Sequence, residues 1–251
     1  MTLPSDRSLR DAYIDLVKRS ITNYLYLGKK AAFTKFNGVV HYDPKKGEWL
    51  IDAHARPMTV LSKGQLDLIE KSVVDLENRN VPGDYIEAGV WRGGAIILTR
   101  ALLDAYGIKQ RKIFAADSFS GIPKNQSFRH DPVDLWNDRW DISLEEVKAN
   151  IERFGLLDDR IEFVPGFFLD SLPALAKNRF ALIRLDSDAH DSVLTSLEYL
   201  YPLLSPGGII IIDDWHLIGC RIAVDAYRKK HGIDEEVFVE DGNGYWLKSL
   251  T

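Results

Sequence analysis

Apolar and polar positions along this 251-residue chain follow one pattern before residue 80 and another after it. Over residues 10–27 apolar side chains recur every three or four positions, which predicts an amphipathic helix. A second helical pattern covers about 62–78. Residues 28–57 contain several glycines and prolines, so we expect this stretch to be irregular. We therefore expect residues 1–80 to form an N-terminal helical extension and lid.

From residue 84 onward short apolar runs alternate with helical patterns. The apolar runs predict strands at about 84–89, 112–117, 161–165, 180–186 and 208–213, with a closing pair near 235–239 and 244–248. The helical patterns lie at about 94–106, 143–154, 169–176, 191–203 and 219–231. This alternation is typical of βαβ units and a mainly parallel sheet. We expect a doubly wound, Rossmann-like α/β fold over residues 81–251.

Aspartates end two of these apolar runs. Asp186 closes the run at 180–185, and the pair Asp213-Asp214 closes the run at 208–212. Parallel strands place their carboxyl ends at one edge of the sheet, where ligands bind in open α/β folds. Clustered carboxylates repel one another unless a cation lies between them, and Mg²⁺ prefers oxygen ligands. The three aspartates are candidate metal ligands, although each alone could instead cap a following turn or helix.

The first predicted strand of the sheet leads into a glycine-rich turn, Glu87-x-Gly89-x-x-x-Gly93-Gly94. We expect Gly89 to permit the turn, and Gly93 and Gly94 to leave room for a ligand. The spacing is not the dinucleotide fingerprint, which argues against a nicotinamide dehydrogenase. The next strand ends in Asp117, a natural partner for ribose hydroxyls. A positively charged nucleoside without phosphates, S-adenosylmethionine, fits these acids, whereas the alternative is a glycine turn with a structural acid.

A general base is predicted close to the metal ligands. Asp188 follows Asp186 by two residues, so an unliganded carboxylate there could accept a proton from a substrate hydroxyl. His190 and His216 are competing candidates for this role. Residues 120–142 show no helical or strand period and contain two prolines and two tryptophans, Pro123, Pro132, Trp136 and Trp140. We expect this long loop to be a lid.

Composition narrows the class of protein. The hydrophobic fraction of 45% and the charged fraction of 27% are ordinary for a globular protein. A net charge of -5 gives no reason to expect nucleic acid or an anionic membrane as a partner. Cys220, the only cysteine, excludes an intramolecular disulfide, and the polar start argues against a secretory signal, so a cytoplasmic protein is expected. The amphipathic first helix has no obvious groove to fill, which favours a homo-oligomer.

Several linear motifs together resemble the macrocin O-methyltransferase family. They are VPGDYIEAGVWRGGA at 81–95, ADSFSGIP at 116–123, FGLLDD at 154–159, LSPGG at 204–208, IDD at 212–214 and CRIAVDAYRKKHGI at 220–233. The resemblance covers about residues 10–248. It implies a class I methyltransferase fold with strand order 3-2-1-4-5-7-6, and transfer of a methyl group from S-adenosylmethionine to a sugar hydroxyl of a natural product, with Mg²⁺, in antibiotic biosynthesis.

The resemblance also implies residue roles. Asp186, Asp213 and Asp214 fall on the metal ligands, and Asp188 falls on the proposed base. The cofactor-binding residues that it implies are Met58, Thr59, Glu87, Gly89, Trp91, Asp117, Ser118, Phe167 and Asp186. The segment Asp186-Ser187-Asp188-Ala189-His190 departs from the family's usual Asp-Gly-Asp-Ser-Tyr.

Two further functions fit the same residues. A catechol-type O-methyltransferase shares the carboxylate chemistry but methylates one hydroxyl of a phenol pair. A non-catalytic, cofactor-holding partner subunit would need the glycine turn alone. The presence of four aspartates in one predicted cleft argues against that subunit, because a protein without catalysis has no need of them.

Overall fold

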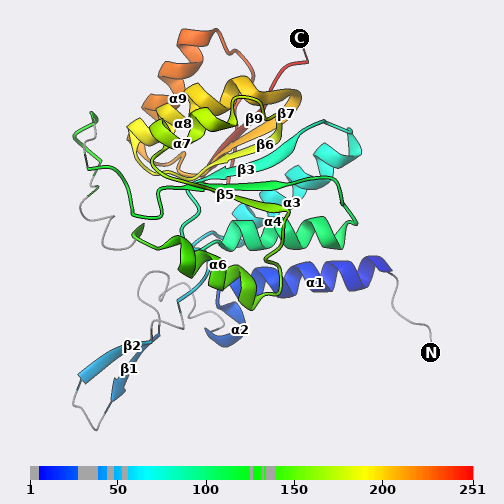
Figure 1. Cartoon of the computed structure of the whole chain (residues 1–251), viewed down its shortest axis with the longest axis vertical. Helices are drawn as coiled ribbons and strands as arrows, with labels where there is room; N and C mark the ends of the chain where they lie inside the picture. The colour runs from blue at the N-terminus through cyan, green and yellow to red at the C-terminus, as the bar shows by residue number, and fades with distance from the viewer. Residues whose placement is uncertain are drawn as a thin grey trace.

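A seven-stranded sheet with helices on both faces organises the chain (Figure 1). The computed structural model describes residues 6–27, 39–43, 48–52, 56–124, 127–131, 133 and 140–250. The strands of the sheet are β3 (Asp84–Ala88), β4 (Ile113–Asp117), β5 (Ile161–Pro165), β6 (Phe180–Leu185), β7 (Leu204–Ile212), β8 (Phe238–Glu240) and β9 (Asn243–Leu247). Their order is β5-β4-β3-β6-β7-β9-β8. Numbered from the first strand of the sheet, this is the predicted 3-2-1-4-5-7-6.

The sheet is mixed rather than fully parallel. Strands β3 to β7 pair in parallel, whereas β9 runs antiparallel to β7 and β8 runs antiparallel to β9. The carboxyl ends of β3, β4, β6 and β7 therefore meet at one edge. The order reverses between β3 and β6, and a crevice at such a point is the usual ligand site of this architecture.

The two faces of the sheet carry separate hydrophobic cores. Helices α3 (Lys63–Asn78), α4 (Gly94–Ala105) and α6 (Leu144–Arg153) share one core with Tyr85 and Ala115. Helices α8 (His190–Leu200) and α9 (Ile218–His231) share the other core with Ile86 and Phe114. Successive strand residues point to opposite faces and both are buried here, which explains why the strands are continuous apolar runs.

The predicted helix over 10–27 is two helices in the structure. Helix α1 (Asp6–Ile21) ends before Asn23, whose φ of +59° breaks the helix, and α2 (Tyr24–Leu27) is a single turn. Residues 28–57, expected to be irregular, contain the antiparallel strand pair of β1 (Val39–Asp43) and β2 (Glu48–Asp52). The prediction of irregular structure was wrong for these two strands, whose sequences VVHYD and EWLID are rich in the β-branched and aromatic residues that favour strands.

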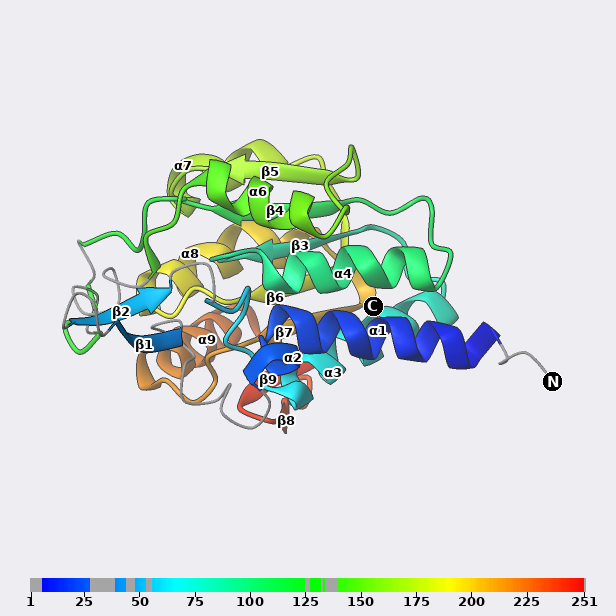
Figure 2. The same cartoon turned by 90° about the horizontal axis from the view of Figure 1, so that it is seen from below.

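Helix α1 packs on the sheet domain. Figure 2 shows α1 lying alongside α4, and Ile14, Val17 and Ile21 are buried in the core that α3 and α4 share. The premise that this helix lacks a groove was therefore wrong, because its own chain supplies one. The homo-oligomer stays a prediction.

The remaining differences concern boundaries. The predicted helix over 169–176 is the α-helical turn α7 (Phe168–Ser171) followed by the 3-10 turn η3 (Leu172–Leu175). A second 3-10 turn, η4 (Tyr201–Leu203), leads into β7, which begins four residues earlier than the apolar run at 208–212 indicated. In the part of the chain that the structure describes, no helix combines the length and the hydropathy needed to cross a bilayer.

Candidate active site

A cavity of about 770 Å³ lies at the carboxyl edge of the parallel strands. The residues to which the family resemblance assigns metal, base and cofactor roles all line it: Met58, Thr59, Glu87, Gly89, Trp91, Asp117, Ser118, Phe167, Asp186, Asp188, Asp213 and Asp214. They come from six separate stretches of sequence. The fold thus gathers the predicted site into one place, which has the size of a small-molecule pocket.

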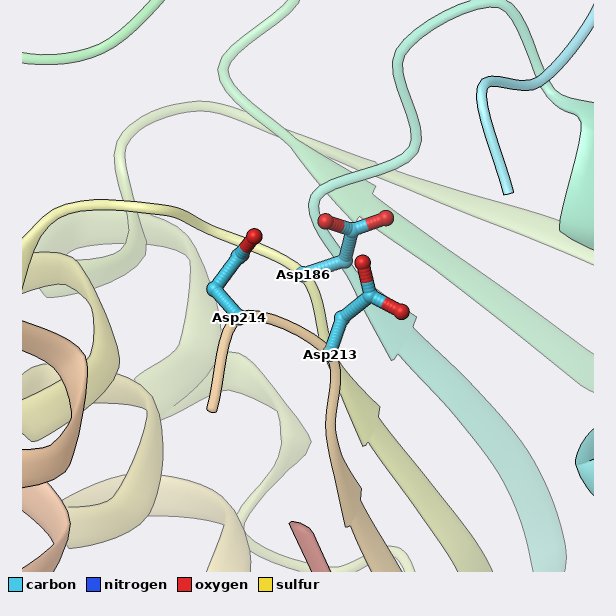
Figure 3. A group of neighbouring side chains, drawn as sticks. All are labelled: Asp186, Asp213 and Asp214. Carbon is cyan, nitrogen blue, oxygen red and sulfur yellow. The ribbon is translucent and has the colours of Figure 1, made fainter. Parts of the chain in front are cut away.

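The three candidate metal ligands face one another (Figure 3). One carboxylate oxygen from each of Asp186, Asp213 and Asp214 can be chosen so that all three lie within 4.8 Å of one another. Two backbone hydrogen bonds fix their positions, since Asp186 N–H donates to Ala88 O at 2.8 Å and Asp213 N–H donates to Leu185 O at 2.9 Å. An all-oxygen set on rigid strand ends suits a hard divalent cation such as Mg²⁺.

Burial and repulsion from neighbouring carboxylates make Asp213 and Asp214 hard to ionise without a cation. Burial raises the pKa of Asp213 to about 7, and Asp186 adds to the rise while Arg184 opposes it. Burial, with repulsion from Asp188 and Asp186, raises the pKa of Asp214 well above its usual value. A divalent ion between the carboxylates would favour their charged forms.

Arg184 is a site residue that the sequence reasoning missed. The residue is 4% exposed, and its guanidinium pairs with Glu87, with Asp186 at 2.9 Å and with Asp213 at 2.6 Å. Burial alone would lower the pKa of Arg184, but the three carboxylates raise it well above its usual value, so the side chain stays charged. The signal in the sequence was a single charged residue inside an otherwise apolar run.

Glu87 lines the cavity and has one carboxylate oxygen without a partner in the described part of the chain. One carboxylate oxygen pairs with Arg184, whereas Oε2 is buried with no hydrogen-bond partner among the described residues. Burial raises the pKa of Glu87 to about 8 despite the pairing with Arg184. A buried acceptor of this kind normally has a partner, and a cationic ligand in the cavity would provide one.

Asp117 shapes the glycine turn. Its Oδ2 accepts the N–H groups of Val90 at 2.6 Å and Trp91 at 3.2 Å, and its Oδ1 accepts that of Phe119 at 2.9 Å. Trp91 has a φ of +44°, an unusual conformation for a non-glycine residue, and these bonds help to hold it. Ser118 Oγ also donates to Oδ1 at 3.4 Å, so four protein donors share this carboxylate, and the longest of these contacts is the one that a ligand hydroxyl would replace.

The glycines of the turn make room mainly for the chain itself. A Cβ on Gly89 would lie 1.6 Å from the carbonyl oxygen of Asp186, and one on Gly94 would lie 2.5 Å from that of Met58. A Cβ on Gly93 would meet Val147 at 3.3 Å, and its φ of +87° favours glycine. The expectation that Gly93 and Gly94 leave space for a ligand is replaced by close packing of Met58, Thr59 and α6 on this turn.

Asp188 differs from the other acids of the site in its backbone conformation and in its lack of hydrogen-bond donors among the described residues. Its φ is +54°, and its N–H donates to Asp214 Oδ2 at 3.2 Å. No described residue donates a hydrogen bond to its carboxylate. Burial, reinforced by Asp186 and Asp213, raises the pKa of Asp188 well above its usual value. A partly buried, unpaired carboxylate of raised pKa has the properties of a proton acceptor.

The two candidate histidines occupy different places. His216 lines the cavity, whereas the lining does not include His190. The ring of His190 contacts Asp191 at 2.7 Å through Nδ1 and stacks on Phe128 with centroids 5.4 Å apart. His190, the first residue of α8, therefore packs against Phe128 of the predicted lid.

The described part of the predicted lid contributes Gly121, Ile122, Pro123 and Trp140 to the cavity wall. Ser127 hydrogen-bonds Asp191 through both its N–H and its hydroxyl. Trp140 meets Trp91 edge to face, with ring centroids 5.4 Å apart, and both tryptophans line the cavity. Pro132 and Trp136 lie outside the described residues.

The fold and site place the chain in a known class. Its structure matches a solved structure entitled "Structure of the O-methyltransferase NovP" with a TM-score of 0.81 and 33% identity, over 96% of this chain and 99% of the other. The fold is thus the Rossmann-like fold of class I O-methyltransferases. The model of the macrocin-O-methyltransferase (TylF) family matches residues 10–249.

Two curated relatives are similar over nearly their whole length. The 8-demethyl-8-(2,3-dimethoxy-alpha-L-rhamnosyl)-tetracenomycin-C 4'-O-methyltransferase of Streptomyces olivaceus is 40% identical, over 94% of this chain and 92% of its own. The mycinamicin III 3''-O-methyltransferase of Micromonospora griseorubida is 38% identical, over 95% and 97%. The chain belongs to the macrocin O-methyltransferase family and is an O-methyltransferase.

Proposed function

We propose that this enzyme transfers the methyl group of S-adenosylmethionine to a sugar hydroxyl of a glycosylated natural product, assisted by Mg²⁺. The observation that carries the proposal is one cavity lined by Asp186, Asp213, Asp214 and an unpaired Asp188. The names of two relatives support the acceptor, since they describe methylation of a rhamnosyl group and of a mycinamicin.

The residues at the turn after β3 fit the cofactor. The free Oε2 of Glu87 suits the ammonium of the methionine part, with Asp186 beside it, and Asp117 suits the ribose hydroxyls. Met58 and Thr59, held by backbone bonds to Ile21, close the cavity on the side of the N-terminal extension. Phe167, which is 40% exposed at the cavity wall, offers an apolar surface to the adenine.

The reaction requires a proton acceptor. When bound by the three aspartates, Mg²⁺ would acidify a hydroxyl and stabilise the negative charge on its oxygen. The Asp188 carboxylate takes the hydroxyl proton while the oxygen forms a bond to the methyl carbon and the carbon–sulfur bond breaks. S-Adenosylhomocysteine and the methyl ether are the products, and protonated Asp188 releases its proton to solvent.

A methyl-transfer assay tests the proposal. The enzyme is incubated with S-adenosylmethionine labelled in its methyl group and with deoxysugar glycosides or catechols, in Mg²⁺ or in EDTA. We expect label in the glycosides, dependent on Mg²⁺, and little turnover for Asp213→Ala. The matched control is Asp225→Ala on the exposed face of α9, which should behave as the wild type.

The outcomes separate the alternatives. Label in catechols alone would identify the catechol-type enzyme, and activity undiminished in EDTA would remove the metal from the mechanism. Cofactor binding without label in any acceptor would favour the non-catalytic subunit.

We also propose that the enzyme is a homo-oligomer. Leu9, Tyr13 and Leu16 form one strip along α1 beside its buried residues, and they are 58%, 38% and 53% exposed. Apolar side chains repeated along one helix face favour contact with a second copy. Light scattering at micromolar concentration tests this: we expect a multiple of 28.5 kDa, and a monomer mass would exclude it.

A further inference from the structure

The Asp213 carboxylate is held by more donors than the other candidate metal ligands. Arg184 donates to Oδ1 at 2.6 Å, and Gln65 Nε2 donates to the same oxygen at 3.2 Å. The amide of Asn243, oriented by its surroundings with the nitrogen toward Asp213, donates to Oδ1 at 2.8 Å. All three donors reach one oxygen and none of them reaches Oδ2.

Two of these donors come from outside the strand-end motifs. Gln65 lies in the first turn of α3 and lines the cavity. Asn243 begins β9, the antiparallel neighbour of β7, and is 1% exposed. The Asn243 amide also donates to the carbonyl oxygen of Asp213 at 3.0 Å, so it fixes both the backbone and the side chain of that residue.

The start of α3 determines which way the Gln65 amide points. Ser62 N–H donates to Gln65 Oε1 at 2.8 Å, and Gln65 N–H donates to Ser62 Oγ at 3.1 Å, which together form a capping box. The cap uses the amide oxygen, so the nitrogen is the atom left to face Asp213. The capping box at Ser62 therefore orients the Gln65 amide so that its nitrogen donates to Asp213.

We propose that Gln65 and Asn243 are positioning residues that hold Asp213 in the orientation that binds Mg²⁺. The inference rests on the metal site of the proposed function. A carboxylate whose Oδ1 is held by three N–H donors cannot rotate freely, so its Oδ2 keeps one direction. Groups that orient a metal ligand in this way typically account for about 10- to 100-fold in metal affinity or activity.

Mg²⁺ binding separates this role from helix capping. We compare Gln65→Met, which removes the donor to Asp213, with Ser62→Ala, which removes the capping hydroxyl and leaves that donor in place. Isothermal titration of MgCl₂ into each protein saturated with S-adenosylhomocysteine should show a Kd about 10- to 100-fold higher for Gln65→Met. Ser62→Ala should match the wild type, although both variants weaken the start of α3.

Asn243→Ala provides a second, independent variant. We expect it to raise the Mg²⁺ Kd in the same range as Gln65→Met, and to leave the Kd for S-adenosylhomocysteine within about twofold of the wild type. If both variants bind Mg²⁺ as the wild type does while Asp213→Ala does not, the positioning role is overturned and the metal site stands. If Asp213→Ala also binds Mg²⁺ normally, the metal site itself is wrong, and the positioning role with it.

Discussion

Asp188 is the acid whose environment best suits a base. It receives no hydrogen bond from a described side chain, whereas Asp213 and Asp117 are each held by several donors. In Asp188→Asn, Mg²⁺ and cofactor should still bind because the substitution is nearly isosteric. Turnover should fall by roughly two to four orders of magnitude, the usual contribution of a positioned base. Single-turnover methyl transfer measures this directly.

Substitutions at the two histidines test the assignment of Asp188 as the base. His190→Ala should lose much less activity, because its ring contacts Asp191 and Phe128 rather than the cavity. His216 lines the cavity and is the stronger competitor. A nearly inactive His216→Ala beside an active Asp188→Asn would transfer the base assignment to the histidine.

Asp117 leads to the converse prediction, in which cofactor binding changes and metal binding does not. Asp117→Ala removes the acceptor for three backbone N–H groups and for the ribose hydroxyls. Loss of hydrogen bonds to a charged group costs about 1.5–3 kcal/mol each, so the Kd for S-adenosylhomocysteine should rise at least roughly tenfold. Calorimetry with MgCl₂ should show unchanged metal affinity. Equal losses of both affinities would mean that Asp117 supports the whole edge of the sheet.

At the scale of elements, the parallel strands were predictable to within a few residues. Each buried strand is an apolar run between turn signals, and a polar residue at its end belongs to the ligand edge. This logic selected Asp186, Asp213 and Asp214, whose carboxylates cluster at that edge, while their role as metal ligands stays a prediction. Arg184 was missed because a single charge inside a run scarcely alters an apolar pattern.

Gln65 and Asn243 could not be predicted in the same way. Gln65 lies 148 residues from Asp213 in sequence, and only the packing of α3 against the sheet edge joins them. The capping box at Ser62 predicts a helix start but not what that start faces. Local pattern therefore identifies the groups that end strands, whereas the residues that support them depend on tertiary packing.

Helix α1 is attached to α3 by a buried cation. Lys18 is 7% exposed and pairs with Asp67 at 2.6 Å and Glu70 at 2.5 Å. Lys18→Met should lower the free energy of unfolding by about 1–3 kcal/mol, because each acid loses its Lys18 contact at a partly buried position and keeps only Lys63 or Tyr106 as a partner among the described residues. The control is Arg19→Met on the same helix, whose exposed pair with Asp15 is worth at most about 1 kcal/mol. Urea unfolding measures both, and equal effects would contradict the attachment.

At the scale of the whole molecule, the buried acid cluster links stability to pH and to metal. The pKa of Glu87 is raised to about 8 and that of Asp213 to about 7, in both cases mainly by burial. The metal-free folded protein therefore binds more protons than the unfolded chain between about pH 4 and pH 8. Its stability should fall as pH rises through this window, because the unfolded state then holds fewer protons.

Mg²⁺ should reverse this trend, since it binds the deprotonated carboxylates and must displace protons at low pH. We expect the increase in Tm on adding MgCl₂ to be larger at pH 8 than at pH 6. Thermal unfolding with and without MgCl₂, at constant ionic strength, measures this difference. Asp213→Ala should show little increase at either pH, which separates site binding from general salt effects. An increase of the same size at both pH values in the wild type would show that metal binding and proton release at the cluster are not linked.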